Sequence, residues 1–366
     1  YIYMFENDKR IVVTLDAGGT NCVFCAMRAG RYIIEPVSLK SNAHDLDLCL
    51  GTMVKGFREV MSRLDEKPVA ISFAFPGPAD YEHGIIGGFL PNFPSFRDGV
   101  ALGPFLEDTF GIPVFINNDG DLFAYGEALG GILPEVNRRL EAMGSAKRYK
   151  NLLGYTWGTG FGIGSVIDGR LNRGNNSCVE TFCLDHKLKA GVIAEEGVAA
   201  RAVGRVYGEL SGNASHGLEP KDIFDIAEGL REGDREAALG AFREFGTVSG
   251  HSMATAVTLT DSLVVIGGGL TGSRKYIMPS LLEEMRSTLS TLSGETVQRV
   301  QMEVFDLDDE AEFARFAAGE ARPLKVYGSE RTVTYDPMKR TGVAISKLGA
   351  SQAIAIGAYS FALANV

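Results

Sequence analysis

The chain has 366 residues, of which 45% are hydrophobic and 22% are charged, and its formal net charge is −10. This composition is ordinary for a soluble protein of one or, more often, two domains. The negative charge argues against nucleic acid as a direct partner, because binding it requires basic side chains that neutralise phosphates. No apolar run is long enough to cross a membrane, and five cysteines with no signal peptide indicate a reducing cytoplasm.

Strands and helices alternate along the chain. The patterns predict strands at 11–16, 22–28, 31–37, 69–75, 112–116 and from Leu263, a glycine-rich hairpin at 151–175, and a strand at 325–335. They predict helices at 46–64, 122–129, 195–210, 220–231, 235–258, 279–292, 309–318 and 351–363, and a solvated helix and loop at 135–150. We interpret residues 301–349 as a surface subdomain or an oligomer contact.

The first predicted strand ends in Asp16 and runs into Gly18, Gly19, Thr20 and Asn21. Adjacent glycines let backbone N–H groups approach an anion, and Thr20 and Asn21 add side-chain donors. Asp16 stands where it could face a phosphate-bound Mg²⁺, through waters, because Mg²⁺ gives up its hydration shell reluctantly. The alternative is a Gly-Gly β-turn that binds no ligand.

A second glycine-rich segment contains Gly158, Thr159, Gly160 and Gly162. A helix should follow a dinucleotide-binding fingerprint, but here a strand follows, with a turn signal at Asp168-Gly169. We therefore predict a hairpin that brings backbone amides to a phosphate. Close packing of two strands is the alternative.

A third segment, Gly267, Gly268 and Gly269, follows a buried apolar run. A broad, flat ligand part such as a purine ring could lie against this backbone. The alternative is a simple turn from a strand to a helix that begins near Pro279.

Three glycine-rich strand ends in this order resemble the sugar-kinase, actin and Hsp70 superfamily of ATPases, and more closely the ROK family of bacterial sugar kinases and sugar-responsive repressors. The segments that carry the resemblance span nearly the whole chain: 16–21, 75–78, 117–119 with 126–127, 158–162 and 267–269. The resemblance implies an α/β, two-lobed RNase H-like (actin-like) ATPase fold with mixed sheets flanked by helices. The expected lobes are 1–118 with 350–366, and 119–349. A homodimer is implied by the resemblance alone.

The resemblance also implies a chemistry. ATP and Mg²⁺ would bind at Asp16 and the glycine loops, and Asp119 would act as the general base that accepts the proton of a sugar hydroxyl. Asn118 would hold sugar hydroxyls. The alternative for Asp119 is an Asx-turn or a helix N-cap. The neighbouring Asp121 is expected to point elsewhere.

Candidate sugar ligands are Asn92 and Glu180, and a later family glutamate corresponds to Glu195 or Glu196. Here the chain departs from the family, since position 183 is a cysteine, the nearest histidine is His186, and the later zinc cysteines are absent. The spacing of Cys178, Cys183 and His186 is not that of a structural zinc site, so we expect no zinc.

Two classes of function remain. The first is a cytoplasmic, ATP-dependent hexose or N-acetylhexosamine kinase that acts at the 6-hydroxyl, like a glucokinase. The second is a sugar-sensing transcriptional regulator without its DNA-binding domain, or a non-catalytic sugar-binding protein. The first phosphate strand begins by residue 11, which leaves no room for a preceding helix-turn-helix. Intact Asp16 and Asp119 favour the kinase.

Overall fold

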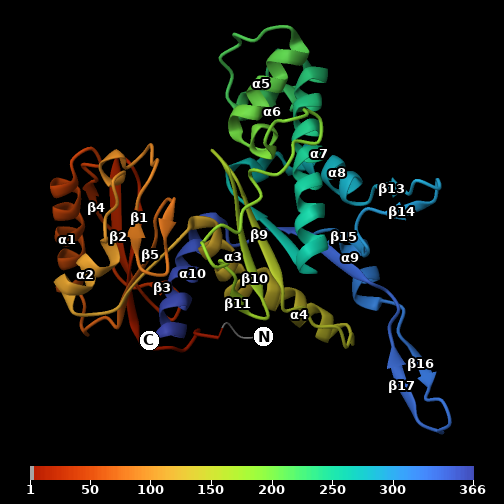
Figure 1. Cartoon of the computed structure of the whole chain (residues 1–366), viewed down its shortest axis with the longest axis horizontal. Coiled ribbons are helices and arrows are strands. Elements are labelled where there is room, and N and C mark those ends of the chain that lie inside the picture. The colour runs from red at the N-terminus through yellow and green to blue at the C-terminus, as the bar shows by residue number, and fades with distance from the viewer. Residues whose placement is uncertain (1–3) are drawn as a thin grey trace. The chain divides into compact units, whose positions relative to one another are not determined.

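The computed structural model describes residues 4–366 and divides by packing into two compact units (Figure 1). Unit 1 comprises the chain up to Pro134, Gly164–Val179 and Leu348–Val366, and unit 2 comprises Glu135–Ile163 and Glu180–Lys347. This division differs from the predicted lobes, because it assigns 119–134 and 164–179 to unit 1. The two lobes expected from the resemblance, 1–118 with 350–366 and 119–349, stay a prediction. In the described part of the chain, no helix combines the length and the apolar character needed to span a bilayer.

A six-stranded mixed sheet forms the centre of unit 1. Its order is β3-β2-β1-β5-β8, with β4 paired to β2. The strands are β1 (Ile11–Ala17), β2 (Asn21–Arg28), β3 (Arg31–Tyr32), β4 (Val37–Lys40), β5 (Ala70–Ala74) and β8 (Val114–Asn117). The prediction of one strand at 31–37 was wrong, because Pro36 lacks a backbone donor and separates two short strands.

Helices cover this sheet. They are α1 (Leu46–Ser62), α2 (Leu102–Phe110), α3 (Asp119–Gly130) and α10 (Ala350–Asn365), with a short helix η1 (Pro94–Phe96) and a small ribbon of β6 (Ala79–Asp80) and β7 (Ile85–Ile86). Asp45 caps α1 by accepting the Leu48 N–H over 3.0 Å, and Met53 and Phe57 face the core. Helices α3 and α10 pack against each other. The sequence patterns had not indicated α2.

Unit 2 is built on four parallel strands of a second six-stranded sheet, whose order is β11-β10-β9-β12-β18-β15. The strands are β9 (Leu152–Trp157), β10 (Phe161–Ile167), β11 (Arg170–Leu171), β12 (Leu263–Gly267), β15 (Glu303–Asp306) and β18 (Arg340–Ile345). Strand β10 begins in unit 2 and continues into the segment assigned to unit 1. The turn predicted at Asp168-Gly169 is confirmed, since both residues have positive φ, as a type I′ turn requires.

The helices of unit 2 are α4 (Ile132–Ala142, whose first residues belong to unit 1), η2 (Ala194–Gly197), α5 (Ala200–Ser211), α6 (Pro220–Glu228), α7 (Arg235–Thr260), η3 (Gly269–Ser273), α8 (Arg274–Met285) and α9 (Glu310–Ala318). The helix predicted at 279–292 was misplaced. Helix α8 begins before Pro279 because Ile277 and Leu281 are buried, and tertiary packing overrides the proline signal.

Two β-hairpins extend from unit 2 (Figure 1). The first pairs β13 (Thr288–Ser290) with β14 (Thr296–Gln298), and the second pairs β16 (Arg322–Lys325) with β17 (Thr332–Tyr335). The single strand predicted at 325–335 was therefore wrong. The Val326 N–H donates to the Arg331 carbonyl over 2.9 Å, and Gly328 takes a positive φ in the turn between the two strands.

Candidate active site

Two carboxylates come together at one edge of the sheet of unit 1. Asp16 lies near the end of β1, and Asp119 opens α3 directly after β8. Because β1, β5 and β8 are parallel, their carboxyl ends meet at the same edge. Both aspartates line one pocket of about 220 Å³, whose other walls come from β2, β3, β5 and α10.

The surroundings of Asp119 raise its pKa above the ordinary value. Solvent reaches the residue, but protein atoms closely surround its carboxyl group, and the charge of Asp16 lies nearby. Both effects disfavour the ionised form. Asp119 therefore holds a proton more readily than an ordinary aspartate, which suits a group that accepts one.

The turn between β1 and β2 is held by backbone hydrogen bonds. The Gly18 N–H donates to the Asn21 carbonyl over 3.0 Å, and the Ser41 hydroxyl donates to the Gly18 carbonyl. A Cβ atom at Gly18 would lie 2.8 Å from the Asn21 carbonyl oxygen, so the turn requires glycine. A Cβ at Gly19 would lie 3.2 Å from Asn92, so this predicted sugar ligand packs against the predicted phosphate turn.

Asn118 is the N-cap of α3. Its Oδ1 accepts the Gly120 N–H over 2.7 Å, so the helix-cap alternative applies to Asn118, and Asp119 is the first helical residue. The cap engages only one of the lone pairs of Oδ1. A role for Asn118 toward sugar hydroxyls stays a prediction.

A second carboxyl of α3 is buried close by. Burial raises the pKa of Asp121 to about 7, and the positive charge of Arg173 offsets part of that shift. Nη1 of Arg173 donates to Oδ1 of Asn117 over 2.9 Å. No sequence motif identified Arg173 as a residue of the site. Only the folding of the segment after β11 brings Arg173 to the end of β8.

The two glycine segments of unit 2 lie side by side. Strands β9 and β12 are parallel neighbours, so the turn that begins at Gly158 and the turn at Gly268 leave the same edge of the sheet. Gly268 has φ +98°, and a Cβ there would lie 2.3 Å from the Trp157 carbonyl oxygen. This close approach admits only glycine, and it holds the two turns together.

The Glu195 carboxylate supports the turn between β9 and β10. Its Oε2 accepts the Phe161 N–H over 3.1 Å, and its Oε1 accepts from Nη2 of Arg201 over 3.1 Å. Nη1 of Arg201 also donates to the Thr159 carbonyl over 3.3 Å. Sequence reasoning assigned Glu195 to the sugar, and that role stays a prediction. The contacts in the structure are to the glycine turn.

His186 is buried, and its Nε2 lies 3.9 Å from the Glu244 carboxylate. Burial and the nearby charge of Arg205 lower the pKa of His186. Cys178 and Cys183 are exposed free thiols. Across residues 4–366, no cluster of three or more His, Cys, Asp or Glu side chains has an arrangement that could hold a metal ion.

The predicted site residues divide between the two units. Those of unit 1 are Asp16, Gly18, Gly19, Thr20, Asn21, Asn92, Asn118 and Asp119. Those of unit 2 are Gly158, Thr159, Gly160, Gly162, Glu180, Glu195, Gly267, Gly268 and Gly269. Thr20 and Asn21 are exposed, and Glu180 is half-buried, so solvent reaches all three side chains.

Comparison with known proteins identifies the family. The model of the ROK family matches residues 12–311. The chain belongs to the ROK family. The actin-like ATPase fold with mixed α/β sheets, expected for a ROK protein, is confirmed.

Relatives of this ROK protein include kinases and repressors. It is 25% identical to the N-acetylgalactosamine kinase AgaK of Shewanella sp. (strain ANA-3) over 273 residues, which are 70% of this chain and 80% of that protein. It is 29% identical to the xylose repressor of Bacillus spizizenii over 139 residues, which are 37% of this chain and 31% of that protein.

Two solved structures are similar to this ROK protein. A glucokinase from Parabacteroides distasonis is 59% identical, with a TM-score of 0.93, over 99% of this chain and 100% of that one. A ROK family glucokinase from Streptomyces griseus, solved with glucose and AMPPNP, is 18% identical, with a TM-score of 0.59, over 96% of this chain and 98% of that one. The second likeness concerns the fold alone.

Proposed function

We propose that this chain transfers a phosphoryl group from ATP to a hexose or an N-acetylhexosamine, at the 6-hydroxyl, as a glucokinase does. One observation carries the proposal: Asp119 opens α3 in the same pocket as Asp16, and its pKa is raised. A base works best when its pKa is closer to the working pH than that of an ordinary carboxylate.

The comparisons support a sugar kinase and leave the sugar open. The Parabacteroides protein, 59% identical, is a glucokinase, whereas the Shewanella relative, 25% identical, is an N-acetylgalactosamine kinase. We therefore propose the class of substrate and let the first experiment choose the sugar.

In unit 1, Asp119 would accept the proton of the attacking hydroxyl. Asn92 and Asn118 carry amide groups that both donate and accept, as pairs of sugar hydroxyls require. The turn from Gly18 to Asn21 would bind phosphate oxygens through its N–H groups. Mg²⁺, when bound, neutralises phosphate charge, and the exposed Asp16 carboxylate is a ligand type that it prefers, directly or through water.

In unit 2, the turn from Gly158 to Gly162 would bind phosphate through backbone N–H groups, and the turn at Gly268 would support the nucleoside. Glu195 and Arg201 keep the first of these turns in place. Glu180 would contact the sugar. All five cysteines are free thiols, which suits the reducing cytoplasm where we place this activity.

The test is ADP release with Mg·ATP across a panel of hexoses and N-acetylhexosamines. We expect turnover with at least one sugar and a fall in kcat of about 100-fold or more in Asp119→Asn, because that variant lacks the base. Asp121→Asn, an equivalent change two residues along α3, is the matched control and should keep most of the activity. If Asp121→Asn loses turnover and Asp119→Asn keeps it, the assignment of the base is wrong.

The repressors among the relatives supply the competing function. A sugar-responsive binding protein would gain thermal stability from one sugar of the panel and release no ADP with any of them. That result would reject the kinase and favour a regulator that kept the fold.

A further inference from the structure

The side chain of Asn117, the last residue of β8, is a buried amide held by an arginine. Its Oδ1 accepts from Nη1 of Arg173 over 2.9 Å. Across residues 4–366, Nδ2 of Asn117 has no hydrogen-bond partner. Burying an amide donor without a partner costs free energy, so the stability of β8 does not explain an asparagine at this position. The backbone is held separately, since the Asn117 carbonyl accepts the Phe75 N–H over 3.0 Å.

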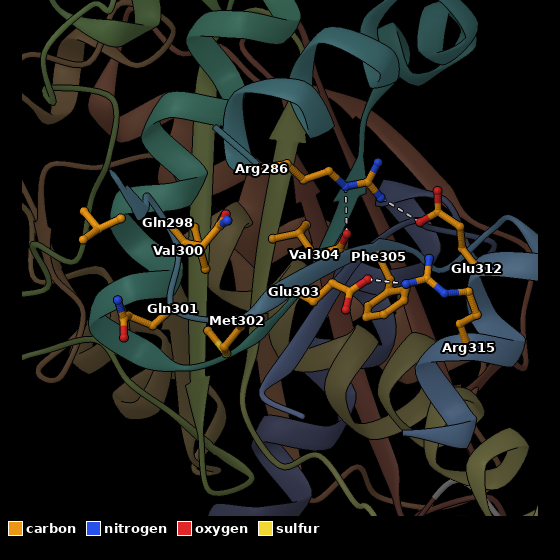
Figure 2. Close-up of a pocket in the computed structure, with 11 residues that line it drawn as sticks. Arg286, Gln298, Val300, Gln301, Met302, Glu303, Val304, Phe305, Glu312 and Arg315 are labelled. Atoms are coloured by element: carbon orange, nitrogen blue, oxygen red, sulfur yellow. Dashed lines mark hydrogen bonds and ion pairs between the residues drawn. The ribbon is translucent and has the colours of Figure 1, made fainter. Parts of the chain in front are cut away.

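Arginines elsewhere in the chain are placed differently. In the groove of unit 2 shown in Figure 2, Arg286 pairs with Glu312 and Arg315 pairs with Glu303. Solvent reaches all four side chains, and ion pairs in water contribute little to stability. The half-buried Arg173 donates instead to a neutral amide that solvent does not reach.

Two further groups of unit 1 hold the guanidinium of Arg173. Its Cζ lies 5.4 Å from the ring centroid of Phe361 in α10, within the range of a cation–π interaction. Burial raises the pKa of Asp121 in α3 to about 7, and the positive charge of Arg173 lowers it. Arg173 thus interacts with β8, α3 and α10, the elements around the start of α3.

The hairpin of β10 and β11 brings Arg173 to this point. The Asn172 N–H donates to the Ser165 carbonyl over 2.7 Å, so the pairing of the hairpin continues up to Arg173. A Cβ atom at Gly164 would lie 2.1 Å from the Gly120 carbonyl oxygen, so β10 packs directly on the first turn of α3. The guanidinium therefore reaches Asn117 from a backbone that is itself fixed against α3.

We propose that Arg173 is a positioning residue for the general base Asp119. Asn117, Asn118 and Asp119 are consecutive, and the chain changes from strand to helix between them. By holding the Asn117 side chain, Arg173 fixes the direction in which Asp119 enters the pocket that it shares with Asp16. A small displacement of a reacting group costs a large part of the rate. This inference rests on the proposed kinase activity.

The first test is ADP release by Arg173→Ala with the sugar that the panel selects. We expect kcat to fall about 10-fold and the KM for ATP to change less than about twofold, because the base moves while the glycine turns stay in place. Arg170→Ala removes an exposed arginine from the same hairpin, and this matched control should keep the activity of the unsubstituted chain. If Arg173→Ala is as active as Arg170→Ala, the proposal is wrong.

A double-mutant cycle separates positioning from a general loss of packing. Arg173→Ala and Asn117→Ala remove the two halves of one hydrogen bond, so we expect the double variant to be no slower than the slower single variant. Losses of kcat that multiply would show that the two residues act independently, and would overturn the proposal. Guanidinium ion at low concentration should restore kcat to Arg173→Ala, which keeps the test valid if Asn117→Ala does not fold. Without that restoration the side chain acts through packing alone, and the proposal is wrong.

A titration distinguishes failure of this inference from failure of the proposed function. NMR of the chain labelled at its aspartate carboxyl carbons follows Asp121, whose signal Asp121→Asn identifies. Arg173→Ala should raise the pKa of Asp121 further, because the positive charge that lowers it is gone. An unchanged pKa means that Arg173 does not face α3, and the inference fails whether or not the chain is a kinase. An unsubstituted chain that releases no ADP with any sugar rejects the proposed function, and the positioning role with it, even where the titration shows the expected rise.

Discussion

At the scale of single residues, two carboxyl groups of α3 differ in their surroundings although they lie two positions apart. Asp119 lines a pocket with Asp16, and Asp121 is buried with Arg173 as its compensating charge. Their pKa values are both raised. Asp119 is the one that solvent reaches, which is why we assign the proton transfer to it.

Asp121 makes the stability of the fold depend on pH. Its pKa rises from 3.8 to about 7 on folding, so the folded state binds the proton more tightly, and stability falls as pH rises between these values. At 1.36 kcal/mol per pKa unit, the loss is about 4 kcal/mol. We expect Asp121→Asn, which cannot ionise, to raise the melting temperature more at about pH 8 than at about pH 5. Thermal unfolding followed by circular dichroism tests this, and an equal gain at both pH values contradicts it.

The roles of Glu180 and Glu195 can be distinguished by whether a substitution changes the KM for sugar or the KM for ATP. Glu195→Gln weakens charge-assisted bonds to Phe161 and Arg201, so we expect the KM for ATP to rise about 10-fold while the KM for sugar changes little. Glu180→Gln should raise the KM for sugar instead. The matched control is Glu209→Gln, an exposed glutamate of α5 that pairs with Arg205, and it should leave both KM values unchanged. If Glu195→Gln raises only the KM for sugar, Glu195 contacts the sugar, as the sequence analysis predicted.

At the scale of elements, local patterns predicted those segments whose conformation depends on near neighbours. The amphipathic repeat of α1 and the turn at Asp168-Gly169 are confirmed. The bounds of α8 were predicted wrongly, because buried contacts with distant segments set them. Strands β16 and β17 were missed, because together they form an unusual exposed ribbon.

The contact between α3 and α10 depends on two glycines. A Cβ at Gly126 would lie 1.8 Å from the Ala353 carbonyl oxygen, and one at Gly357 would lie 2.0 Å from that of Leu122. We expect Gly126→Ala to force the helices apart, at a cost of about 1–3 kcal/mol or more, and to lower the melting temperature. Gly51→Ala in α1, where a Cβ meets nothing within 4 Å, is the matched control and should stabilise by up to about 1 kcal/mol. Equal melting temperatures for the two variants would contradict this account.

At the scale of the whole molecule, charge is unevenly distributed. The formal net charge of the chain is −10, yet residues 322–335, which form the hairpin of β16 and β17, contain three basic side chains and one acidic one. Composition predicted the overall sign. It could not predict that residues 322–335 would stand apart from the rest of unit 2 as a ribbon (Figure 1).

The sequence by itself determined the glycine-rich strand ends, most strands and helices, and the family, because these depend on local conformation and on short ordered motifs. Tertiary structure alone decided which side chains meet: Asp119 with Asp16, Glu195 with the glycine turn, and Arg173 with Asn117. These partners lie far apart along the chain. The order of strands in each sheet and the packing of helices bring them together, and no local pattern encodes that order.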